Sequence, residues 1–356
     1  MSKQFLDFGL LTPVLILVVL SLATLFSINP MLFRSQCIYF LVSLFAFFFF
    51  SQTQYYVLRF WVLPIYIGSL IILAFVLFLG FESRGAVRWI DVFGLQIQFS
   101  EILKPFLLVS LCAYISDKPR SGKYLLITCL LLLPIAFLIY RQPDLGNALV
   151  YVGTAALLLI VFGFPLRWFL GGLGILGLLS PIMWNFLQGY QRDRVLTFFN
   201  KSNDPLGISY NAVQAIIAVG SGSFLGKGLS QGTQSALRFL PERHTDFIFA
   251  TLSESLGFIG AACVIVCFVL LLFKIYTLFT QTEDVFAKTF CAGVFLLFLL
   301  HFFINVSMNI GIVPIVGITL PFMSYGGSSL LSNFILLGLL SSIRKEQRNA
   351  NVLEIR

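Results

Sequence analysis

The sequence is poor in charged residues, which make up 11% of its 356 positions. A soluble globular domain carries about 25% charged residues, whereas hydrophobic residues here reach 58%. So much apolar surface cannot be hidden inside a water-soluble fold, because a large share of it must face outward. The shortage of charge therefore excludes a soluble globular protein and indicates that lipid surrounds most of the chain.

Two further absences narrow the class of protein. The six cysteines all fall within apolar runs, and the i,i+4 pair Cys263 and Cys267 has no His or further Cys nearby. These cysteines predict packing, and nothing in their spacing indicates a disulfide framework. The first apolar run, 9–28, has no small-residue cleavage site after it, which predicts a retained helix and not a removed signal peptide.

Apolar runs long enough to cross a bilayer dominate what is present. They predict an all-α polytopic membrane protein, a bundle of about ten transmembrane helices, because single apolar runs can satisfy their backbone only as helices. The predicted spans are 9–28, 36–50, 61–81, 101–116, 124–140, 147–163, 168–187, 247–273, 289–308 and 318–343.

Basic residues predict the orientation of these spans. An even number of helices places both termini on one side, and Lys and Arg accumulate on the cytoplasmic side. With cytoplasmic termini, the inner set is Lys3, Arg59, Lys118, Arg120, Lys123, Arg167, Lys274, Lys288, Arg344, Lys345, Arg348 and Arg356. The outer set is smaller: Arg34, Arg84, Arg88, Lys104 and Arg141. We therefore expect a multi-pass protein of a cytoplasmic membrane, with both termini inside.

The chain reads as one transmembrane domain, 1–356, with no soluble appendage large enough to fold alone. A long extracytoplasmic loop, 188–246, joins the seventh and eighth predicted helices, and we expect an amphipathic, partly re-entrant segment there because long structureless loops are uncommon. The outer loop 82–100 alternates apolar and polar residues and is expected on the membrane surface. A short polar cytoplasmic tail, 344–356, ends the chain.

Few ionisable residues interrupt the apolar runs. Glu101 and Lys104 open the fourth predicted helix, Glu254 lies near the outer start of the eighth, and His301 lies in the ninth. Intramembrane charges usually mark function, and three of these four lie toward the outer leaflet. The alternatives are a local Glu101–Lys104 ion pair that caps the helix, a hydrogen-bonded Glu254, and simple packing of His301.

The densest polar cluster, 240–249, stands where the long loop re-enters the membrane. Glu242, Arg243, His244, Thr245 and Asp246 follow one another and directly precede an apolar helix. Thr245 or Asp246 could merely be the helix N-cap, but that reading does not explain the neighbouring ionisable groups. A partly desolvated carboxylate beside cations is suited to general-base catalysis, which makes Asp246 the candidate base.

Two outer turns join this pattern. Residues 141–146 connect the fifth and sixth predicted helices, and residues 321–329 carry Gly and Ser near the start of the tenth. Backbone N–H groups of such a Gly-rich turn can bind an anion, although Gly and Ser also allow close helix packing.

These motifs together resemble the SEDS family (shape, elongation, division and sporulation), and within it the rod-shape type, RodA. The matching stretches are 85–89, 100–104, 142–146, 190–194, 204–207, 214 with 220–222, 226–228, 240–249 and 320–329. Arg243 before His244 favours the elongation type over the division paralogue. Asn147, Ser255 and Ser307 depart from the residues that are usual in the family.

The resemblance implies a peptidoglycan glycosyltransferase that polymerises lipid II, the undecaprenyl-diphosphate disaccharide-pentapeptide, for cell-wall elongation and rod shape. It implies a class B penicillin-binding protein as partner and assistance from a divalent cation, Mg²⁺ or Mn²⁺, with unknown ligands. Asp246 matches the family's catalytic Asp. The expected substrate-binding residues are Arg88, Trp89, Glu101, Lys104, Asp144, Arg192, Arg194, Gln214, Lys227, Glu242, Arg243, His244, Ser324 and Ser328.

Rival functions remain open at this point. A lipid II flippase would also need many helices, but it should place polar groups near the midplane at discontinuous helices, whereas these charges gather at the outer face. A scaffold without catalysis would not need a desolvated carboxylate beside several cations. The division-type paralogue is a further alternative.

Overall fold

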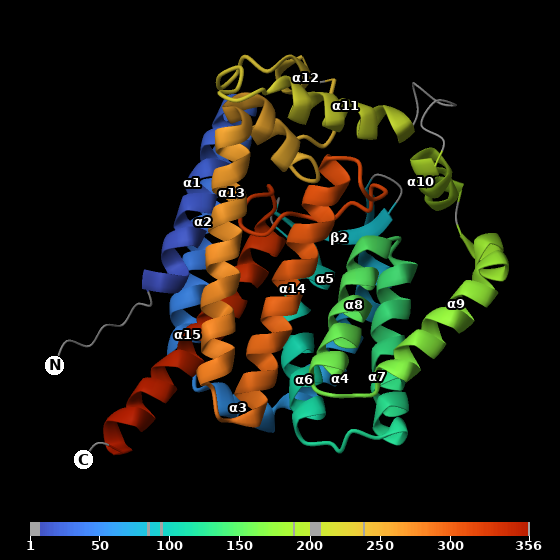
Figure 1. Cartoon of the computed structure of the whole chain (residues 1–356), viewed down its shortest axis with the longest axis vertical. Coiled ribbons are helices and arrows are strands. Elements are labelled where there is room, and N and C mark those ends of the chain that lie inside the picture. The colour runs from blue at the N-terminus through green and yellow to red at the C-terminus, as the bar shows by residue number, and fades with distance from the viewer. Residues whose placement is uncertain are drawn as a thin grey trace.

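The structure, a computed structural model, describes residues 8–83, 86–92, 95–187, 189–199, 208–237 and 239–354. Helices dominate these segments, and a bundle of them crosses the molecule from end to end (Figure 1). Its helices are α1 (Phe8–Ile28), α2 (Pro30–Gln52), α4 (Val62–Leu79), α5 (Phe99–Ile102) continued by α6 (Lys104–Ser116), α7 (Gly122–Arg141), α8 (Leu145–Val161), α9 (Leu166–Phe186), α13 (Ile248–Gln281), α14 (Val285–Asn309) and α15 (Gly327–Glu354).

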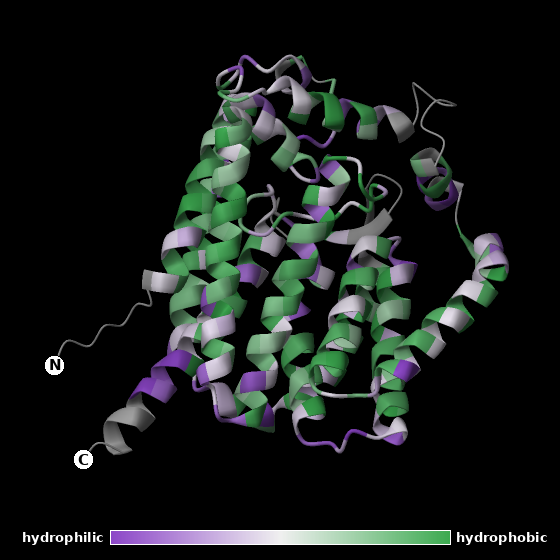
Figure 2. Cartoon of the chain, viewed as in Figure 1, coloured by the Kyte–Doolittle hydropathy of each residue, from purple (hydrophilic) through white to green (hydrophobic). Residues whose placement is uncertain are grey.

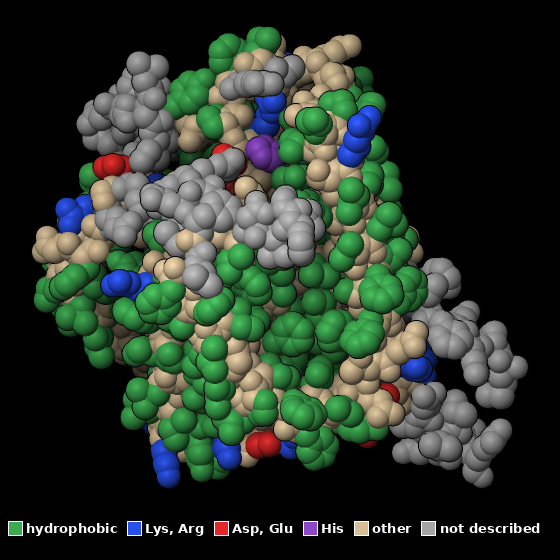
Figure 3. All heavy atoms as spheres, turned by 180° about the vertical axis from the view of Figure 1, so that it is seen from behind, with side chains coloured by type: hydrophobic (Ala, Val, Ile, Leu, Met, Phe, Trp, Pro, Cys, Tyr) green, Lys and Arg blue, Asp and Glu red, His purple; other side chains and the backbone are tan. Residues whose placement is uncertain are grey.

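These helices have the length and composition of membrane spans. Eight are long and apolar enough to cross a bilayer, and two shorter apolar helices, Val62–Phe78 and Leu145–Val161, occupy the remaining predicted positions. Apolar residues cover the helices, with polar residues concentrated toward the two ends (Figure 2). The rear face shows the same apolar band, with charged side chains mostly above and below it (Figure 3). The predicted polytopic helical bundle is confirmed.

The two ends of the bundle differ. At one end, here the α3 end, lie the short helix α3 (Tyr55–Phe60) and the 117–121 turn. At the other, the α11 end, lie α10 (Gly189–Phe199), α11 (Ile208–Ser221), α12 (Thr233–Ala236) and a small antiparallel sheet (Figure 1). The long loop thus contains three helices, of which α11 and α12 lie over this end of the bundle and α10 lies to its side (Figure 1).

The sheet forms from the alternating segment after α4. Its strands are β1 (Phe81–Ser83), β2 (Ala86–Val92) and β3 (Leu95–Ile97), in the order β1-β2-β3. Phe81 pairs with Trp89, and Ile90 pairs with Ile97. The alternation of apolar and polar residues in this segment thus corresponds to β-strands. The sheet places Trp89 at the α11 end of the molecule.

The predicted start of the last span is wrong. We expected a helix from residue 318, but residues 312–326 are not helical and α15 begins at Gly327. Leu320 N donates to Ser324 Oγ over 2.8 Å, and side-chain bonding of this kind competes with helix formation. The non-helical segment instead enters the polar end of the molecule. At its other end α15 continues through the predicted tail as far as Glu354.

Helix α13 is broken near its start. Gly257 has φ 65° and ψ −159°, which only glycine adopts readily. A loop formed by residues 222–228 fills the break: Lys227 N donates to Glu254 O over 3.0 Å, and Phe258 N donates to Ser223 O over 2.9 Å. A Cβ on Gly226 would lie 2.3 Å from Ser255 O. Glycine at both positions therefore allows the loop backbone to replace the missing helical bonds.

The core holds these elements rigidly, with one exception. Helices α2 and α15 pack closely along their lengths; the Phe334 ring lies 5.7 Å from Phe40 and 6.5 Å from Phe47. A Cβ on Gly338 would lie 2.8 Å from Phe47 O, so a small residue permits this approach. Helix α9 differs, because none of its residues is buried and it leans away from α7 and α8 (Figure 1).

Candidate active site

A cavity of about 710 Å³ opens at the α11 end, where the non-helical segments converge. Its lining combines the sheet, the turns before α8 and α13, helix α10 and the segment before α15. The residues that line it are Trp89, Gln98, Glu101, Pro143, Asp144, Leu145, Asn147, Leu149, Gln191, Arg194, Val195, Glu242, Thr245, Asp246, Pro314, Ile315, Val316, Gly317, Thr319, Tyr325, Gly326, Ser328 and Ser329.

Asp246 lies at the wall of this cavity, just before α13. It is partly exposed, whereas the next four residues are buried. The helix N-cap is Phe247 and no side chain caps the helix, so the alternative that Thr245 or Asp246 is only an N-cap is wrong. The Thr245 hydroxyl instead donates to Glu242 Oε2 over 3.1 Å. The Asp246 side chain thus lines the cavity.

Two buried asparagines hold the backbone of Asp246. Asn305 Nδ2 and Asn309 Nδ2 each donate to Asp246 O over 3.1 Å. Asn309 Oδ1 also accepts from Ala250 N over 3.1 Å, one of the first-turn donors that a helix leaves unpaired. Both side chains are fully buried. One turn of α14 therefore fixes where the carboxylate stands.

A strap formed by residues 314–319 lines the cavity next to Asp246. Asn305 Nδ2 donates to Ile318 O over 2.6 Å, and Arg194 Nη1 donates to Val316 O over 3.2 Å. A Cβ on Gly317 would lie 3.4 Å from Asp246 Oδ2 and 3.8 Å from Arg194 Nη1. A carboxylate and a guanidinium thus flank the same backbone segment.

The predicted clusters 240–249 and 320–329 meet at this site. Ser324 Oγ donates to Thr245 O over 2.7 Å, and Tyr325 N donates to His244 O over 2.8 Å. The rings of His244 and Tyr325 lie 5.6 Å apart. Two segments nearly eighty positions apart in the sequence therefore form one wall, as expected for parts of one site.

A buried polar network lies behind the cavity. Lys104 Nζ donates to Glu101 Oε2 over 2.8 Å and to Asn147 Oδ1 over 3.0 Å, and it lies 3.1 Å from His301 Nε2. Lys104 is only 2% exposed. The Glu101–Lys104 ion pair, which was the alternative to a binding role, is present, and its cation stands behind Glu101 and Asn147, which line the cavity.

Asp144 joins the same network from the turn before α8. Its Oδ2 accepts from Gln98 Nε2 over 2.7 Å and from Asn147 Nδ2 over 2.8 Å. Ser328 Oγ accepts from Gln98 N over 2.9 Å. The predicted residues Asp144 and Ser328 are thus joined by Gln98, which the sequence alone did not single out.

Several predicted binding residues lie outside the cavity lining. Arg243 donates to Ser235 O, and Arg192 donates to two backbone carbonyls at the end of α9. Gln214 lies on α11, and its Oε1 is buried without a hydrogen-bond partner. The side chain of Arg88 and the motif at 204–207 lie outside the described residues.

Lys227 is engaged by Glu254, in the loop that fills the α13 break. Lys227 Nζ lies 3.3 Å from Glu254 Oε1. Glu254 Oε1 also accepts from Gln234 N, and its Oε2 accepts from Ser235 N, both over 2.9 Å. The alternative of a hydrogen-bonded structural acid therefore fits Glu254, which anchors the segment that contacts Arg243.

The sequence held a signal for some of the missed residues. Asn305 and Asn309 are amides at i and i+4 within an apolar helix, a spacing that places both on one face. His301 lies one turn earlier on α14 and reaches Lys104 and, through Nδ1, Thr319 O at 3.1 Å. Thr319 and Tyr325 gave no such signal, because their place in the cavity wall depends on the path of the non-helical segment before α15.

Comparisons with known proteins agree with this geometry. A family profile described as cell cycle protein, covering FtsW, RodA and SpoVE, matches residues 3–349. The chain is 36% identical over 293 residues to the peptidoglycan glycosyltransferase MrdB of Escherichia coli (strain K12), covering 81% of this chain and 79% of that one.

Solved structures show the same fold. A chain from a study of the structural coordination of polymerization and crosslinking by a peptidoglycan synthase complex is similar with a TM-score of 0.83 and 30% identity, covering 96% of this chain and 98% of that one. The rod shape determining protein RodA of Thermus thermophilus is similar with a TM-score of 0.71 and 29% identity, covering 95% and 97%.

Proposed function

Because the chain belongs to the FtsW/RodA/SpoVE family of cell cycle proteins, we propose that it polymerises lipid II from the cavity at the α11 end, with Asp246 as general base. It is a peptidoglycan glycosyltransferase of cell-wall elongation: its MrdB relative is named for the transferase activity, and the similar RodA protein is named for determining rod shape. The transferase name of MrdB favours polymerisation over the flippase alternative.

The juxtaposition of Asp246 and Arg194 across Gly317 carries the proposal. The Cβ position of that glycine lies 3.4 Å from the Asp246 carboxylate and 3.8 Å from the Arg194 guanidinium. A base and a cation are the two groups that glycosyl transfer from a diphosphate requires. Both stand at one cavity, at an end of the bundle where a lipid-linked sugar has its headgroup.

In the proposed reaction, a sugar hydroxyl of one substrate attacks the anomeric carbon of another. The new bond is the glycosidic C–O bond, and the bond from the anomeric carbon to the diphosphate oxygen breaks. Asp246 takes the hydroxyl proton, a contribution of about 10²–10⁴-fold, and polyprenyl diphosphate leaves with the bonding electron pair. Because Asn305 and Asn309 hold the Asp246 backbone, the base is in place before substrate binds.

Arg194 is the described cation best placed to stabilise the leaving diphosphate, since it lines the cavity. Fixed positive groups where charge develops usually make the largest contribution to such a transition state. Lys104 acts differently, because it is buried and bonded to Glu101 and Asn147. We assign it to positioning those two cavity residues.

A divalent cation is compatible with the residues present. Among the described residues, no group of three or more His, Cys, Asp or Glu side chains forms a metal cage. Mg²⁺ is commonly held by one or two carboxylates together with substrate phosphates, and Glu242 and Asp246 both line the cavity. Because Asp246 acts as the base, Glu242 and the substrate diphosphate would hold the ion, which would supply additional positive charge beside the diphosphate.

The partner and the orientation follow from the same reasoning. A similar chain was solved within a study of a synthase complex that couples polymerization to crosslinking, which supports a class B penicillin-binding protein as partner here. The excess of Lys and Arg predicted inside supports an α3 end in the cytoplasm and an α11 end outside. Co-purification and reporter fusions at each terminus test these two statements.

The decisive experiment compares purified Asp246→Asn and wild-type protein with lipid II and Mg²⁺. We expect loss of glycan strands for Asp246→Asn at unchanged thermal stability, because the amide cannot accept the proton. Asp193→Asn is the matched control, since Asp193 is an exposed carboxylate on the nearby helix α10. Wild-type polymerisation by Asp246→Asn would remove the carboxylate from the reaction.

A further inference from the structure

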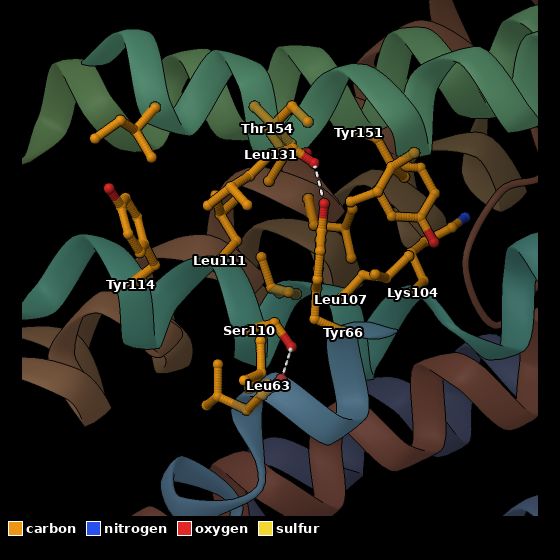
Figure 4. A pocket seen from close by; sticks show the side chains of 16 residues that line it. Leu63, Tyr66, Lys104, Leu107, Ser110, Leu111, Tyr114, Leu131, Tyr151 and Thr154 are labelled. Carbon is orange, nitrogen blue, oxygen red and sulfur yellow. Dashed lines mark hydrogen bonds between the residues drawn. The ribbon is translucent and has the colours of Figure 1, made fainter. Parts of the chain in front are cut away.

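A second, apolar pocket of about 310 Å³ lies between α4, α6, α7 and α8. It shares no lining residue with the catalytic cavity. Side chains such as Leu63, Leu107, Leu111 and Leu131 point into it from different helices (Figure 4). The pocket is therefore separate from the catalytic cavity.

The pocket walls present a mainly apolar surface, because most of their polar groups already form hydrogen bonds within the protein. Tyr66 OH donates to Leu131 O over 2.7 Å, Ser110 Oγ to Phe106 O over 3.0 Å, and Tyr151 OH to Ser100 O over 2.9 Å. The hydroxyl of Thr154, another lining residue, is buried and has no hydrogen-bond partner among the described residues. An apolar chain fits these walls better than a headgroup or water does.

The pocket has the depth of one leaflet. It extends along α6 from Lys104 to Tyr114, ten residues or about 15 Å, half of a hydrocarbon core of about 30 Å. Lys104 and Tyr151 close one end, with 2% and 8% of their surface exposed. Leu63 follows Val62, whose carbonyl accepts from Ser110 Oγ over 3.4 Å, and its side chain is 66% exposed. The pocket therefore opens on the α3 side of the Lys104 layer.

Cations surround this opening. Lys118 Nζ lies 5.9 Å from the centre of the Tyr114 ring, which lines the pocket, and 6.0 Å from that of Tyr124. Lys123 Nζ lies 5.9 Å from the same Tyr124 ring. Asp117, the only acid in the turn 117–123, pairs with Arg59 at 2.5 Å, so the turn keeps a positive excess.

We propose that this pocket binds an anionic diacyl phospholipid, with one acyl chain between α4, α6, α7 and α8 and the phosphate beside Lys118 and Lys123. Basic groups at the end of a crevice between membrane helices favour such lipids. An acyl chain that enters at the α3 end reaches only as far as Lys104. This depth matches a lipid of the leaflet next to the α3 end. The site is separate from the catalytic cavity, and Lys104 stands between the two.

Native mass spectrometry of the full chain in mixed micelles tests the headgroup. The probes are phosphatidylglycerol and phosphatidylcholine with the same acyl chains. We expect the wild type to retain phosphatidylglycerol selectively, and Lys118→Gln/Lys123→Gln to bind it about 25-fold more weakly, at a factor of about five per cation. Lys345→Gln/Arg348→Gln is the matched control, because both residues are exposed at the same end and it should retain the lipid.

A phosphatidylglycerol with a photoreactive group near the end of one acyl chain tests the pocket. We expect labelling of peptides that contain Leu107 and Leu131, and competition by unlabelled phosphatidylglycerol. Equal retention of the two lipids, unchanged binding by the Lys118/Lys123 variant, or labelling spread evenly over the bundle would overturn the proposal. So would displacement by a polyprenyl phosphate in preference to phosphatidylglycerol, which would assign the pocket to the substrate tail.

Discussion

The buried amide of Asn309 should be as important for turnover as for folding. The substitution Asn309→Ala removes its donation to Asp246 O and leaves Ala250 N without its side-chain acceptor. An unpaired buried donor costs about 1–3 kcal/mol, so the free energy of unfolding should fall by that amount. Asn305 still donates to Asp246 O, so the carboxylate should shift and not be lost.

A shift of about 1 Å in a catalytic group can cost on the order of 10²-fold in rate. We therefore expect kcat for glycan polymerisation to fall roughly ten- to hundredfold, with KM for lipid II nearly unchanged because the cavity lining stays intact. The assay is strand formation by the purified variant at several lipid II concentrations, with thermal unfolding measured in parallel.

The matched control is Asn333→Ala, which removes another buried asparagine, on α15. It should lower stability without lowering kcat. If Asn309→Ala loses stability but keeps the wild-type kcat, the asparagine is a structural residue and the claim that it positions the base is wrong.

Three further predictions follow from the same site. Gly317→Ala should lower kcat and destabilise the fold by about 1–3 kcal/mol, because its φ is 76° and its Cβ would face Asp246 Oδ2 at 3.4 Å; an unchanged rate would exclude close packing of the strap. Lys104→Met should lower the free energy of unfolding by about 3–5 kcal/mol by leaving Glu101 unpaired. Adding Glu101→Gln to that variant should restore part of the lost stability, and calorimetry of the wild type and the two variants measures both changes. Chelation by EDTA should reduce strand formation and added Mg²⁺ should restore it, whereas full activity in EDTA would remove the divalent cation from the proposal.

The sequence predicted the fold because hydrocarbon imposes strong rules on a chain. Ten apolar runs predicted ten spans, since each run must satisfy its own backbone in lipid. Residues 318–326 did not follow this rule: they are mostly apolar and were predicted to begin the last span, but they are non-helical, and Ser324 Oγ accepts from Leu320 N there. The break at Gly257 was equally hidden, because glycine alone does not predict a positive φ.

The candidate site was partly predictable for a different reason. Charges are rare in this chain, so Asp246, Glu101 and Asp144 stood out before their neighbours were known. Their arrangement was not predictable, because it depends on tertiary contacts: Lys104 stands behind the cavity wall, and Arg243 faces Ser235. Neutral amides such as that of Asn305 position the backbone of Asp246. A search for charged residues in the sequence does not find them.

The hydrogen bonds between the 222–228 loop and the broken helix α13 couple these two segments. Since the loop supplies donors to the carbonyls of Glu254 and Ser255, pulling it out would expose bare peptide groups to hydrocarbon at several kcal/mol each. The loop and the part of α13 before Gly257 therefore form one hydrogen-bonded unit. A substitution that displaced the loop would also disturb the start of α13, directly after Asp246.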